Sequence, residues 1–226
     1  MDEGNNIIFV ENGISKKVSI SNYFKRIYDE KSWGDDCEVL SGTGSSKSVT
    51  VQLRNELPNI IYKYNIKNIV DCGCGVFNYL NPLVNFLNKN IDSYLGIDIV
   101  ESVISDNNKN SNDKFNFIID DICLTDKIQN ADLVICKEVL MHLTSELVIA
   151  FFRNLKKRNV KYILVTSCRN TCGGLLGSLG NLGSYYKLNL FRKPFNFGGP
   201  LEVITQRDDD DNTKLYLWKI SELPDV

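Results

Sequence analysis

The sequence predicts an α/β protein with a doubly wound, mostly parallel sheet that helices cover on both faces. Five short apolar runs recur along the chain, at 69–71, 94–98, 115–119, 131–136 and 162–166. Helix-like segments separate most of them, at 78–88, 101–108 and 145–157. Continuous apolar strands that alternate with helices are typical of a parallel sheet buried on both faces.

Two further apolar runs close the chain. LEVITQ and KLYLWKI are separated by RDDDDNT, a gap too short for a crossover helix, so the two runs predict an antiparallel hairpin. The aspartates at 208–211 are then its solvated tip. Five parallel strands and a terminal hairpin make a Rossmann-like sheet of seven strands.

Residues 1–45 are expected to form a small extension of hairpin, helix and lid loop before a main domain at 46–226. IIFVENGISKKVSI predicts a hairpin about the Asn12-Gly13 turn. SNYFKRIYDEKSW predicts an amphipathic helix, with apolar side chains close to helical spacing at Tyr23, Phe24, Ile27 and Tyr28. A glycine- and serine-rich loop then leads into a helix expected over roughly 46–64.

Composition restricts the functions to consider. The chain has 226 residues and a formal net charge of -2, which argues against a nucleic-acid-binding surface. Its first residues lack the pattern of a signal peptide, and no apolar run approaches the ~18 residues of a membrane span. Seven scattered cysteines, an odd number, argue against a disulfide framework. We therefore expect a cytoplasmic protein.

The stretch DCGCGVFNYL follows the first predicted parallel strand, where doubly wound sheets bind ligands. Gly73 and Gly75 permit a tight turn and a close approach of backbone to ligand, but the third glycine of the dinucleotide fingerprint is missing. Asp71 places a carboxylate where a diphosphate would lie, so the ligand is expected to be cationic at this end. Cys72 and Cys74 have no second cysteine pair nearby, so no metal site is expected.

Acidic residues also end the next two strands. Asp98 can accept from both hydroxyls of a ribose, and Asp121, followed by Ile122, can accept from an adenine amine. An acidic residue at the end of each of three successive strands is a pattern that resembles the class I S-adenosylmethionine-dependent methyltransferases. The resemblance covers roughly residues 40–222. The resemblance implies S-adenosylmethionine as cofactor and S-adenosylhomocysteine as product. The cofactor-binding residues it implies are Asp71, Gly73, Gly75, Asp98, Ile99, Asp121, Ile122, Lys137, Ser45 and Ser46.

Longer segments resemble one subfamily of these enzymes. They are WGDDCEVLSGTGSS, DCGCGVFNYL, GIDIV, DDICLTDKIQNADLVICKEVLMHL and GSYYKLNLFRKPFNFGGPLEVI. Several members of that subfamily occur in polysaccharide-tailoring contexts. The resemblance therefore implies a sugar or glycan as methyl acceptor.

The residues after the fourth parallel strand are expected to face the acceptor. They lack the N/D-P-P-Y and Pro-Cys segments typical of enzymes that methylate nucleic-acid bases. Glu138 and His142 stand four apart, on one face if this turn is helical. Histidine is suited to accept a proton near neutral pH, so His142 is a candidate base that Glu138 orients, or Glu138 is the base. The alternative is a histidine that only caps or packs the following helix.

A divalent-metal site is not expected here. Related quinone-biosynthesis methyltransferases bind metal through Glu-x-x-Glu-His at this place, and Met141 replaces the second glutamate.

Segment 168–190 is rich in glycine and follows the fifth parallel strand, where a binding loop is expected. Tyr185 and Tyr186 are candidates to stack on a sugar, although packing in the core is the alternative for either. Trp33 and loop 41–46 are expected to close the other side.

The sequence thus predicts methyl transfer to a hydroxyl of a sugar or glycan. The alternatives are another small-molecule or protein acceptor, a cofactor-binding module without catalysis, and a nicotinamide-dependent oxidoreductase, which Asp71 disfavours.

Overall fold

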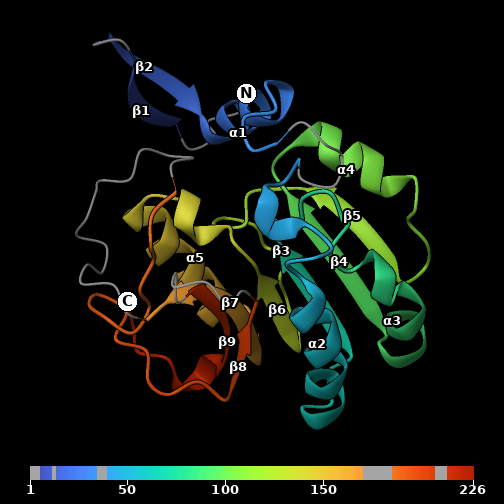
Figure 1. Ribbon diagram of the computed structural model, residues 1–226. Coiled ribbons are helices and arrows are strands. Elements are labelled where there is room, and N and C mark those ends of the chain that lie inside the picture. The colour runs from blue at the N-terminus through green and yellow to red at the C-terminus, as the bar shows by residue number, and fades with distance from the viewer. Residues whose placement is uncertain (1–5, 12–13, 35–39, 170–184, 207–212) are drawn as a thin grey trace.

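The computed structural model describes residues 6–11, 14–34, 40–169, 185–206 and 213–226 (Figure 1). Seven strands form one sheet in the order β5-β4-β3-β6-β7-β9-β8. Their bounds are β3 (Asn68–Cys72), β4 (Ser93–Asp98), β5 (Phe115–Ile119), β6 (Leu133–Cys136), β7 (Tyr162–Cys168), β8 (Glu202–Thr205) and β9 (Thr213–Lys219). Strands β3 to β7 are parallel, and β9 pairs antiparallel with both β7 and β8. The predicted sheet of five parallel strands and a terminal hairpin is confirmed.

Helices bury both faces of this sheet. Side chains alternate along each strand, so Leu133 and Ile135 belong to one apolar core while Val134 and Cys136 belong to the other. The first core packs against α2 (Val51–Lys63) and α3 (Val84–Asn90), and the second packs against α5 (Ser145–Lys157). Helix α4 (Glu101–Asn108) contacts β4 and β5.

Helix α2 begins later than the sequence predicts. It was expected from about residue 46, but residues 43–45 form a short 3-10 helix and α2 begins at Val51. The Ser46 hydroxyl accepts from the Val49 N–H, and the Thr50 hydroxyl donates to the Ser46 carbonyl. Hydroxyl side chains that bond the local backbone in this way compete with helical hydrogen bonds.

The helix expected over 78–88 is also shifted toward the C-terminus. A 3-10 turn at Asn81–Leu83 precedes α3, which ends at Asn90. Pro82 lies in this turn. Because proline has no N–H, it suits the first turn of a helix and disfavours a helix that has already begun.

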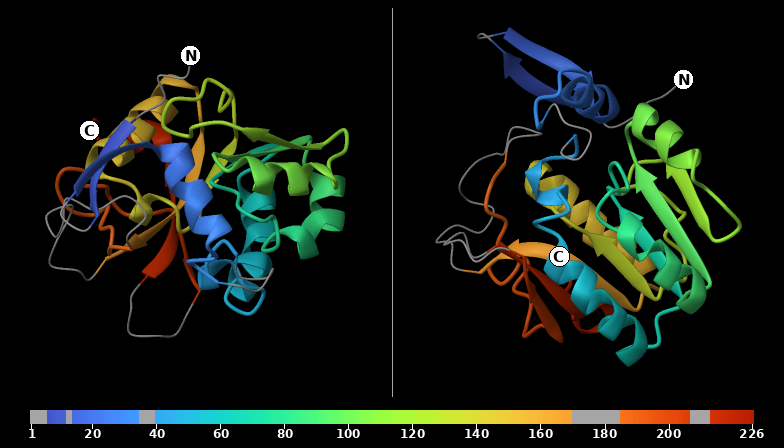
Figure 2. Two further views of the ribbon diagram at one scale, coloured as in Figure 1. Left: turned by 90° about the horizontal axis from the view of Figure 1, so that it is seen from above. Right: turned by 45° about the vertical axis from the view of Figure 1, so that its right-hand side comes forward.

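The N-terminal hairpin and helix are present. Strands β1 (Asn6–Glu11) and β2 (Ile14–Ser19) pair antiparallel, and the Asn12-Gly13 turn lies outside the described residues. Helix α1 (Ile20–Asp29) is capped by Ser19, whose hydroxyl accepts from the Asn22 N–H. Figure 1 and the right-hand view of Figure 2 show the hairpin and α1 above the sheet, on the side of the carboxyl ends of its parallel strands. The aspartates at 208–211 also lie outside the described residues.

A carboxylate is buried under the end of β3. Asp71 is 1% exposed, and its Oδ2 accepts hydrogen bonds from the hydroxyls of Tyr79 and Tyr94. Burial raises the pKa of Asp71 to about 6, against the opposing effect of these bonds and of Lys137. Because this pKa exceeds that of an unfolded aspartate, ionisation of Asp71 lowers stability as pH rises toward and through 6.

Replacing Asp71 by asparagine tests this buried charge. The asparagine side chain would keep an oxygen for the two tyrosines and lose the ionisation. The free energy of unfolding of Asp71→Asn, relative to the natural chain, should rise by about 2 kcal/mol between about pH 4.5 and pH 7.5. Denaturant titrations at the two pH values measure this difference. A difference that does not change with pH would contradict the raised pKa.

Candidate active site

A cleft opens at the carboxyl ends of the parallel strands, directly beneath α1. Its empty volume is about 870 Å³, including open solvent at the mouth. The turn after β3, the ends of β4, β5 and β6, the loop at 41–45 and α1 all contribute to its walls. This is the place at which doubly wound sheets bind ligands.

The turn after β3 has the backbone that only glycine adopts easily. Gly73 has φ 76° and Gly75 has φ 53°. A Cβ at Gly73 would lie 2.4 Å from a methyl of Val139, and one at Gly75 would lie 2.3 Å from the Ser41 hydroxyl. Both glycines are therefore required by conformation and by space.

Asp98 is held firmly at the end of β4. Its side chain is mostly buried, with Oδ2 accepting from the Gly75 N–H at 2.9 Å and Oδ1 from the Val100 N–H at 3.0 Å. Burial raises its pKa, against these backbone bonds. Asp98 and Ile99 both line the cleft. Each carboxylate oxygen can accept a further bond, so Asp98 can still take hydroxyl donors from a ligand.

Four consecutive residues after β5 also line the cleft: Asp120, Asp121, Ile122 and Cys123. Asp120 accepts from the Thr125 hydroxyl, which ties it to its own loop. Asp121 accepts from the Cys123 N–H at 2.8 Å. Asp121 and Ile122 are predicted as site residues from the sequence, whereas Asp120, which also lines the cleft, is not.

The charged groups of the cleft are mainly acidic. Among the described residues that line it, Asp98, Asp120, Asp121 and Glu138 supply carboxylates and Lys137 alone supplies an ammonium. That ammonium is buried and donates to the carbonyl of Gly44 at 2.7 Å. An excess of negative charge favours a cationic ligand and opposes a diphosphate.

Two of the expected cofactor residues do not line the cleft. Asp71 lies beneath the glycine turn, bonded to tyrosines. The Ser46 hydroxyl bonds Ser48 and the Val49 N–H, at the start of α2. Its neighbour Ser45 does line the cleft, and the Ser45 hydroxyl donates to the Gly42 carbonyl.

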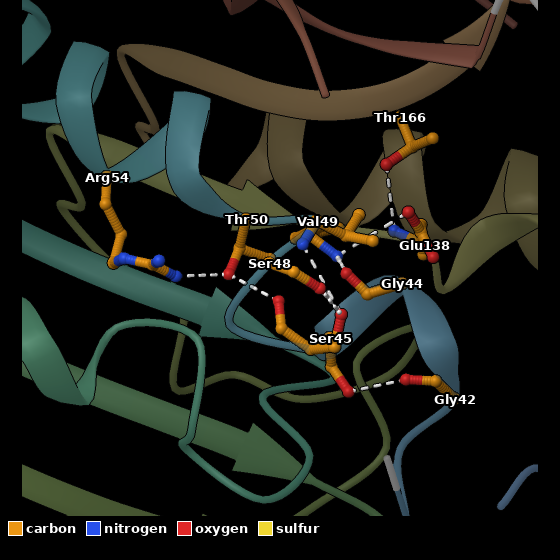
Figure 3. A network of polar contacts seen from close by, with 11 residues as sticks. Gly42, Gly44, Ser45, Ser48, Val49, Thr50, Arg54, Glu138 and Thr166 are labelled. Carbon is orange, nitrogen blue, oxygen red and sulfur yellow. Dashed lines mark hydrogen bonds and ion pairs between the residues drawn. The ribbon is translucent and has the colours of Figure 1, made fainter. Parts of the chain in front are cut away.

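Glu138 follows β6 in an unusual conformation. Its φ of 54° is left-handed, which costs free energy for a residue other than glycine. Its N–H donates to the Thr166 hydroxyl at 2.8 Å (Figure 3). The carboxylate lies against Gly44, where a Cβ would come within 1.4 Å of Oε2. Strained backbone that neighbouring contacts hold in place is common at functional sites.

A second cavity adjoins the cleft, with an empty volume of about 950 Å³ that also includes solvent. Trp33, Ser41, Glu138 and His142 line both. The His142 ring lies 4.8 Å from the Trp33 ring and 6.3 Å from the Tyr185 ring, measured between centroids. The structure thus brings the two candidate bases together at the boundary of the two cavities.

Tyr186 lies away from both cavities. Its hydroxyl donates to the Leu140 carbonyl at 3.2 Å and its N–H to the Met141 carbonyl, so it fixes the turn that carries His142. Burial raises its pKa. Its neighbour Tyr185 is half exposed and lines the second cavity. Most of the expected binding loop, residues 170–184, lies outside the described residues.

The contacts that join the N-terminal extension to the glycine turn are not predicted by any sequence pattern. The Ser41 hydroxyl accepts from the Val76 N–H at 2.9 Å and lies 2.8 Å from the hydroxyl of Tyr28. Ile20, Phe24 and Tyr28 of α1 line the cleft. Helical spacing identified Phe24 and Tyr28 as one face of a helix, but it does not say what that face covers.

Within the described part of the chain, no three or more His, Cys, Asp or Glu side chains are grouped so as to hold a metal ion. None of the described helices has the length and hydropathy needed to cross a bilayer.

Comparison with known proteins defines the class. A family described as a methyltransferase domain matches residues 65–191, more than half of the chain. Among curated proteins, no relative was found.

Several solved structures share the fold. The methyltransferase domain of bacterial CtHen1 has a TM-score of 0.57 at 19% identity, over 76% of this chain and 99% of that one. Magnesium protoporphyrin IX methyltransferase from Synechocystis, solved with bound S-adenosylhomocysteine, has a TM-score of 0.56 at 17% identity, over 88% and 97%. Human N-acetylserotonin methyltransferase, in complex with S-adenosylmethionine, has a TM-score of 0.55 at 13% identity, over 88% and 56%.

The chain therefore belongs to the methyltransferase domain family. Its fold is the Rossmann-like fold of class I enzymes, and the family uses S-adenosylmethionine as methyl donor. The protein is an S-adenosylmethionine-dependent methyltransferase.

The role of Asp98 can be tested by titration calorimetry with S-adenosylhomocysteine. Charge-assisted hydrogen bonds are worth ~1.5–3 kcal/mol each, so Asp98→Ala should weaken binding at least about tenfold. Asp98→Asn, which keeps one acceptor oxygen for the backbone, controls for local unfolding. Asp113→Ala changes an exposed aspartate outside the cleft and should bind normally. Unchanged affinity in Asp98→Ala would contradict the assignment.

Proposed function

We propose that this enzyme transfers the methyl group of S-adenosylmethionine to a hydroxyl of a sugar or glycan. The observation that carries the proposal is the position of Glu138 and His142, which line both the cleft and the second cavity. In this proposal the cleft holds the cofactor and the second cavity holds the acceptor. The two candidate bases then lie where the two ligands meet.

The cleft has the chemistry that the cofactor needs. Asp98 would accept from the ribose hydroxyls, Asp121 would accept from the adenine amine, and the side chain of Ile122 would pack against the base. Ile99 adds apolar wall, and the glycine turn leaves the backbone open to the ligand. The acidic lining suits a sulfonium and an ammonium. When bound, the cofactor supplies an activated methyl group on a cationic sulfur.

Lys137 serves this site indirectly. Its ammonium donates to the Gly44 carbonyl and lies 3.6 Å from Oε1 of Glu138. It therefore holds the loop at 41–45 and the carboxylate side by side. Ser45, which lines the cleft from that loop, is proposed as a cofactor contact, and Ser46, whose hydroxyl bonds Ser48 and the Val49 N–H, is left out of the proposed site.

A hydroxyl acceptor needs a base because its oxygen is a weak nucleophile while protonated. We assign this role to Glu138 or His142, and the proton would pass to a carboxylate oxygen or to an imidazole nitrogen. Glu138 as the base is supported by its strained backbone and by the close contact of its carboxylate with Gly44. Trp33 and Tyr185, whose rings lie near that of His142, offer aromatic surface for the apolar face of a sugar ring.

The proposal also includes a division into domains and a cellular location. We treat residues 1–45 as an extension that covers the cleft and residues 46–226 as the methyltransferase domain. A cytoplasmic location is supported by free thiols, since Cys72, Cys74, Cys123, Cys136 and Cys168 form no disulfide.

Methyl transfer from labelled S-adenosylmethionine to a panel of free sugars and glycans is the direct test. Labelling of amines or proteins alone would favour the second candidate, a methyltransferase for another small molecule or a protein side chain. Binding of S-adenosylhomocysteine without transfer to any fraction of a lysate would favour a module without catalysis.

Substitution of the candidate bases tests the chemistry. Removal of the true base should lower kcat by roughly 10²–10⁴, the usual contribution of general-base catalysis. The variants are His142→Ala and Glu138→Gln, and their affinity for S-adenosylhomocysteine should barely change. The rate should rise with pH through an inflection, and the variant that abolishes this inflection identifies the base. Near-normal turnover in both variants would indicate a more nucleophilic acceptor, such as an amine or thiol.

Gly44→Ala tests the position of the Glu138 carboxylate without removing it. The added methyl would occupy the space of Oε2, and the flexible glutamate side chain should move away from it. We expect a loss of at least about tenfold in kcat if Glu138 is the base, with a normal unfolding transition. Gly198→Ala adds the same methyl where no atom lies within 4 Å, and it should leave kcat unchanged. A normal rate in Gly44→Ala would argue against Glu138.

Chelation tests the expectation that no metal takes part. Because Met141 stands where related metal-dependent enzymes have a second glutamate, activity should survive exhaustive treatment with a chelator. Loss of activity that magnesium or another divalent ion restores would contradict this, and Glu138 would then be the first ligand to test.

A further inference from the structure

Gln206 lies at the edge of the sheet that carries the active site. It directly follows β8, and β8 pairs with β9, whose first residue, Thr213, is paired with Cys168 at the end of β7. The end of β8 therefore lies at the same edge as the ends of β6 and β7. Gln206 lines the second cavity together with Glu138 and His142.

The amide of Gln206 is buried without a partner. The residue is 9% exposed, and within the described chain neither Nε2 nor Oε1 makes a hydrogen bond. A buried donor and a buried acceptor that are both unbonded destabilise a protein, and natural structures contain few of them. An amide in this state on the wall of a cavity is accounted for if a ligand completes its hydrogen bonds.

The chemistry of the cavity defines that ligand. An amide donates and accepts at once, so it matches a group that does the same, such as a hydroxyl or an acylamino group. The carboxylate of Glu138 lies in the same cavity and disfavours an anion. Trp33 and Tyr185 provide aromatic surface beside it. These features together fit a ligand that contains an uncharged ring with polar substituents.

We propose that Gln206 binds the methyl acceptor, through hydrogen bonds from its amide to a neutral hydroxyl or acylamino group of the acceptor ring. This inference rests on the proposed function, in that it takes the second cavity as the acceptor site. It adds a residue that selects the acceptor and defines the chemistry that it selects.

A third cavity also borders Gln206, between α2 and β8. That cavity includes Gln52 and contains neither Glu138 nor His142. Neither candidate base lines that cavity, so a ligand bound there is not the methyl acceptor of this proposal. Gln52 therefore provides a matched control, because it is an exposed glutamine on the other cavity.

The first experiment measures stability and needs no ligand. Methionine matches glutamine in length and has no amide to satisfy, so Gln206→Met should raise the midpoint of thermal unfolding by about 2–4 °C. Gln52→Met should leave the midpoint within about 1 °C. A lower midpoint in Gln206→Met would mean that the amide has a structural role, and would overturn the proposal.

The second experiment measures binding of two defined probes, methyl glucoside and methyl N-acetylglucosaminide, by saturation-transfer NMR with S-adenosylhomocysteine present. Gln206→Met should weaken binding of the preferred probe about tenfold or more, while Gln52→Met should bind it normally. A preference for the second probe would identify the acylamino group as the partner of Gln206, and a preference for the first would identify a hydroxyl.

Failure of the inference and failure of the proposed function give different results. If the natural chain does not bind S-adenosylhomocysteine, the proposed function falls. If it binds S-adenosylhomocysteine and a glycoside, but Gln206→Met binds that glycoside equally well, only the role of Gln206 falls. If it binds S-adenosylhomocysteine and neither glycoside, the acceptor chemistry assigned to Gln206 is wrong.

Discussion

The site depends on close contact between three chain segments at one edge of the sheet: the loop at 41–45, the turn at 73–75 and the exit of β6 at 137–139. In each pairing of these segments, a glycine on one of them leaves the space that a side chain of another occupies. The pairs are Gly44 with Glu138, Gly73 with Val139, and Gly75 with Ser41. Because every segment contacts both others, none can move without displacing the rest.

This packing joins the two cavities to the N-terminal extension. The loop at 41–45 contributes wall to both cavities, and Ser41 connects it to the glycine turn and to Tyr28 of α1. The buried ammonium of Lys137, which follows β6, donates to the carbonyl of Gly44 in the same loop. An interior ammonium is stable only where charge or dipoles compensate it, so the loop and the strand exit stabilise each other. The arrangement of α1 over the cleft follows from the same contacts.

The parts of this structure that the sequence predicts are those with local causes. Apolar runs predict the strands because burial on both faces demands them, and the carboxylates at 98 and 121 follow because strand ends share one edge. The missed features depend on contacts between distant segments. No sequence pattern near Ser46 shows that its hydroxyl delays the start of α2. No sequence pattern identifies Gln206 either, because what distinguishes it is the burial of its amide without a hydrogen-bond partner, which only the structure shows. Family resemblance predicted the cofactor site, but it could not place Tyr186 against the turn that carries His142.

Three residues at this edge reduce stability: Glu138 and Gln206 line the second cavity, and Asp71 lies beneath the glycine turn. Glu138 has a left-handed backbone, burial opposes ionisation of Asp71, and the Gln206 amide has no partner among the described residues. Selection for stability alone would favour other residues at these positions. An asparagine at 138 would adopt the left-handed backbone more easily, an amide at 71 would carry no charge to bury, and an apolar side chain at 206 would leave no hydrogen-bonding group without a partner. The two apolar cores of the described chain are built instead from aliphatic and aromatic side chains that strands and helices bury together. Local sequence–structure preferences are violated mainly at functional sites, so the concentration of these three features at one edge of the sheet agrees with the reaction proposed there.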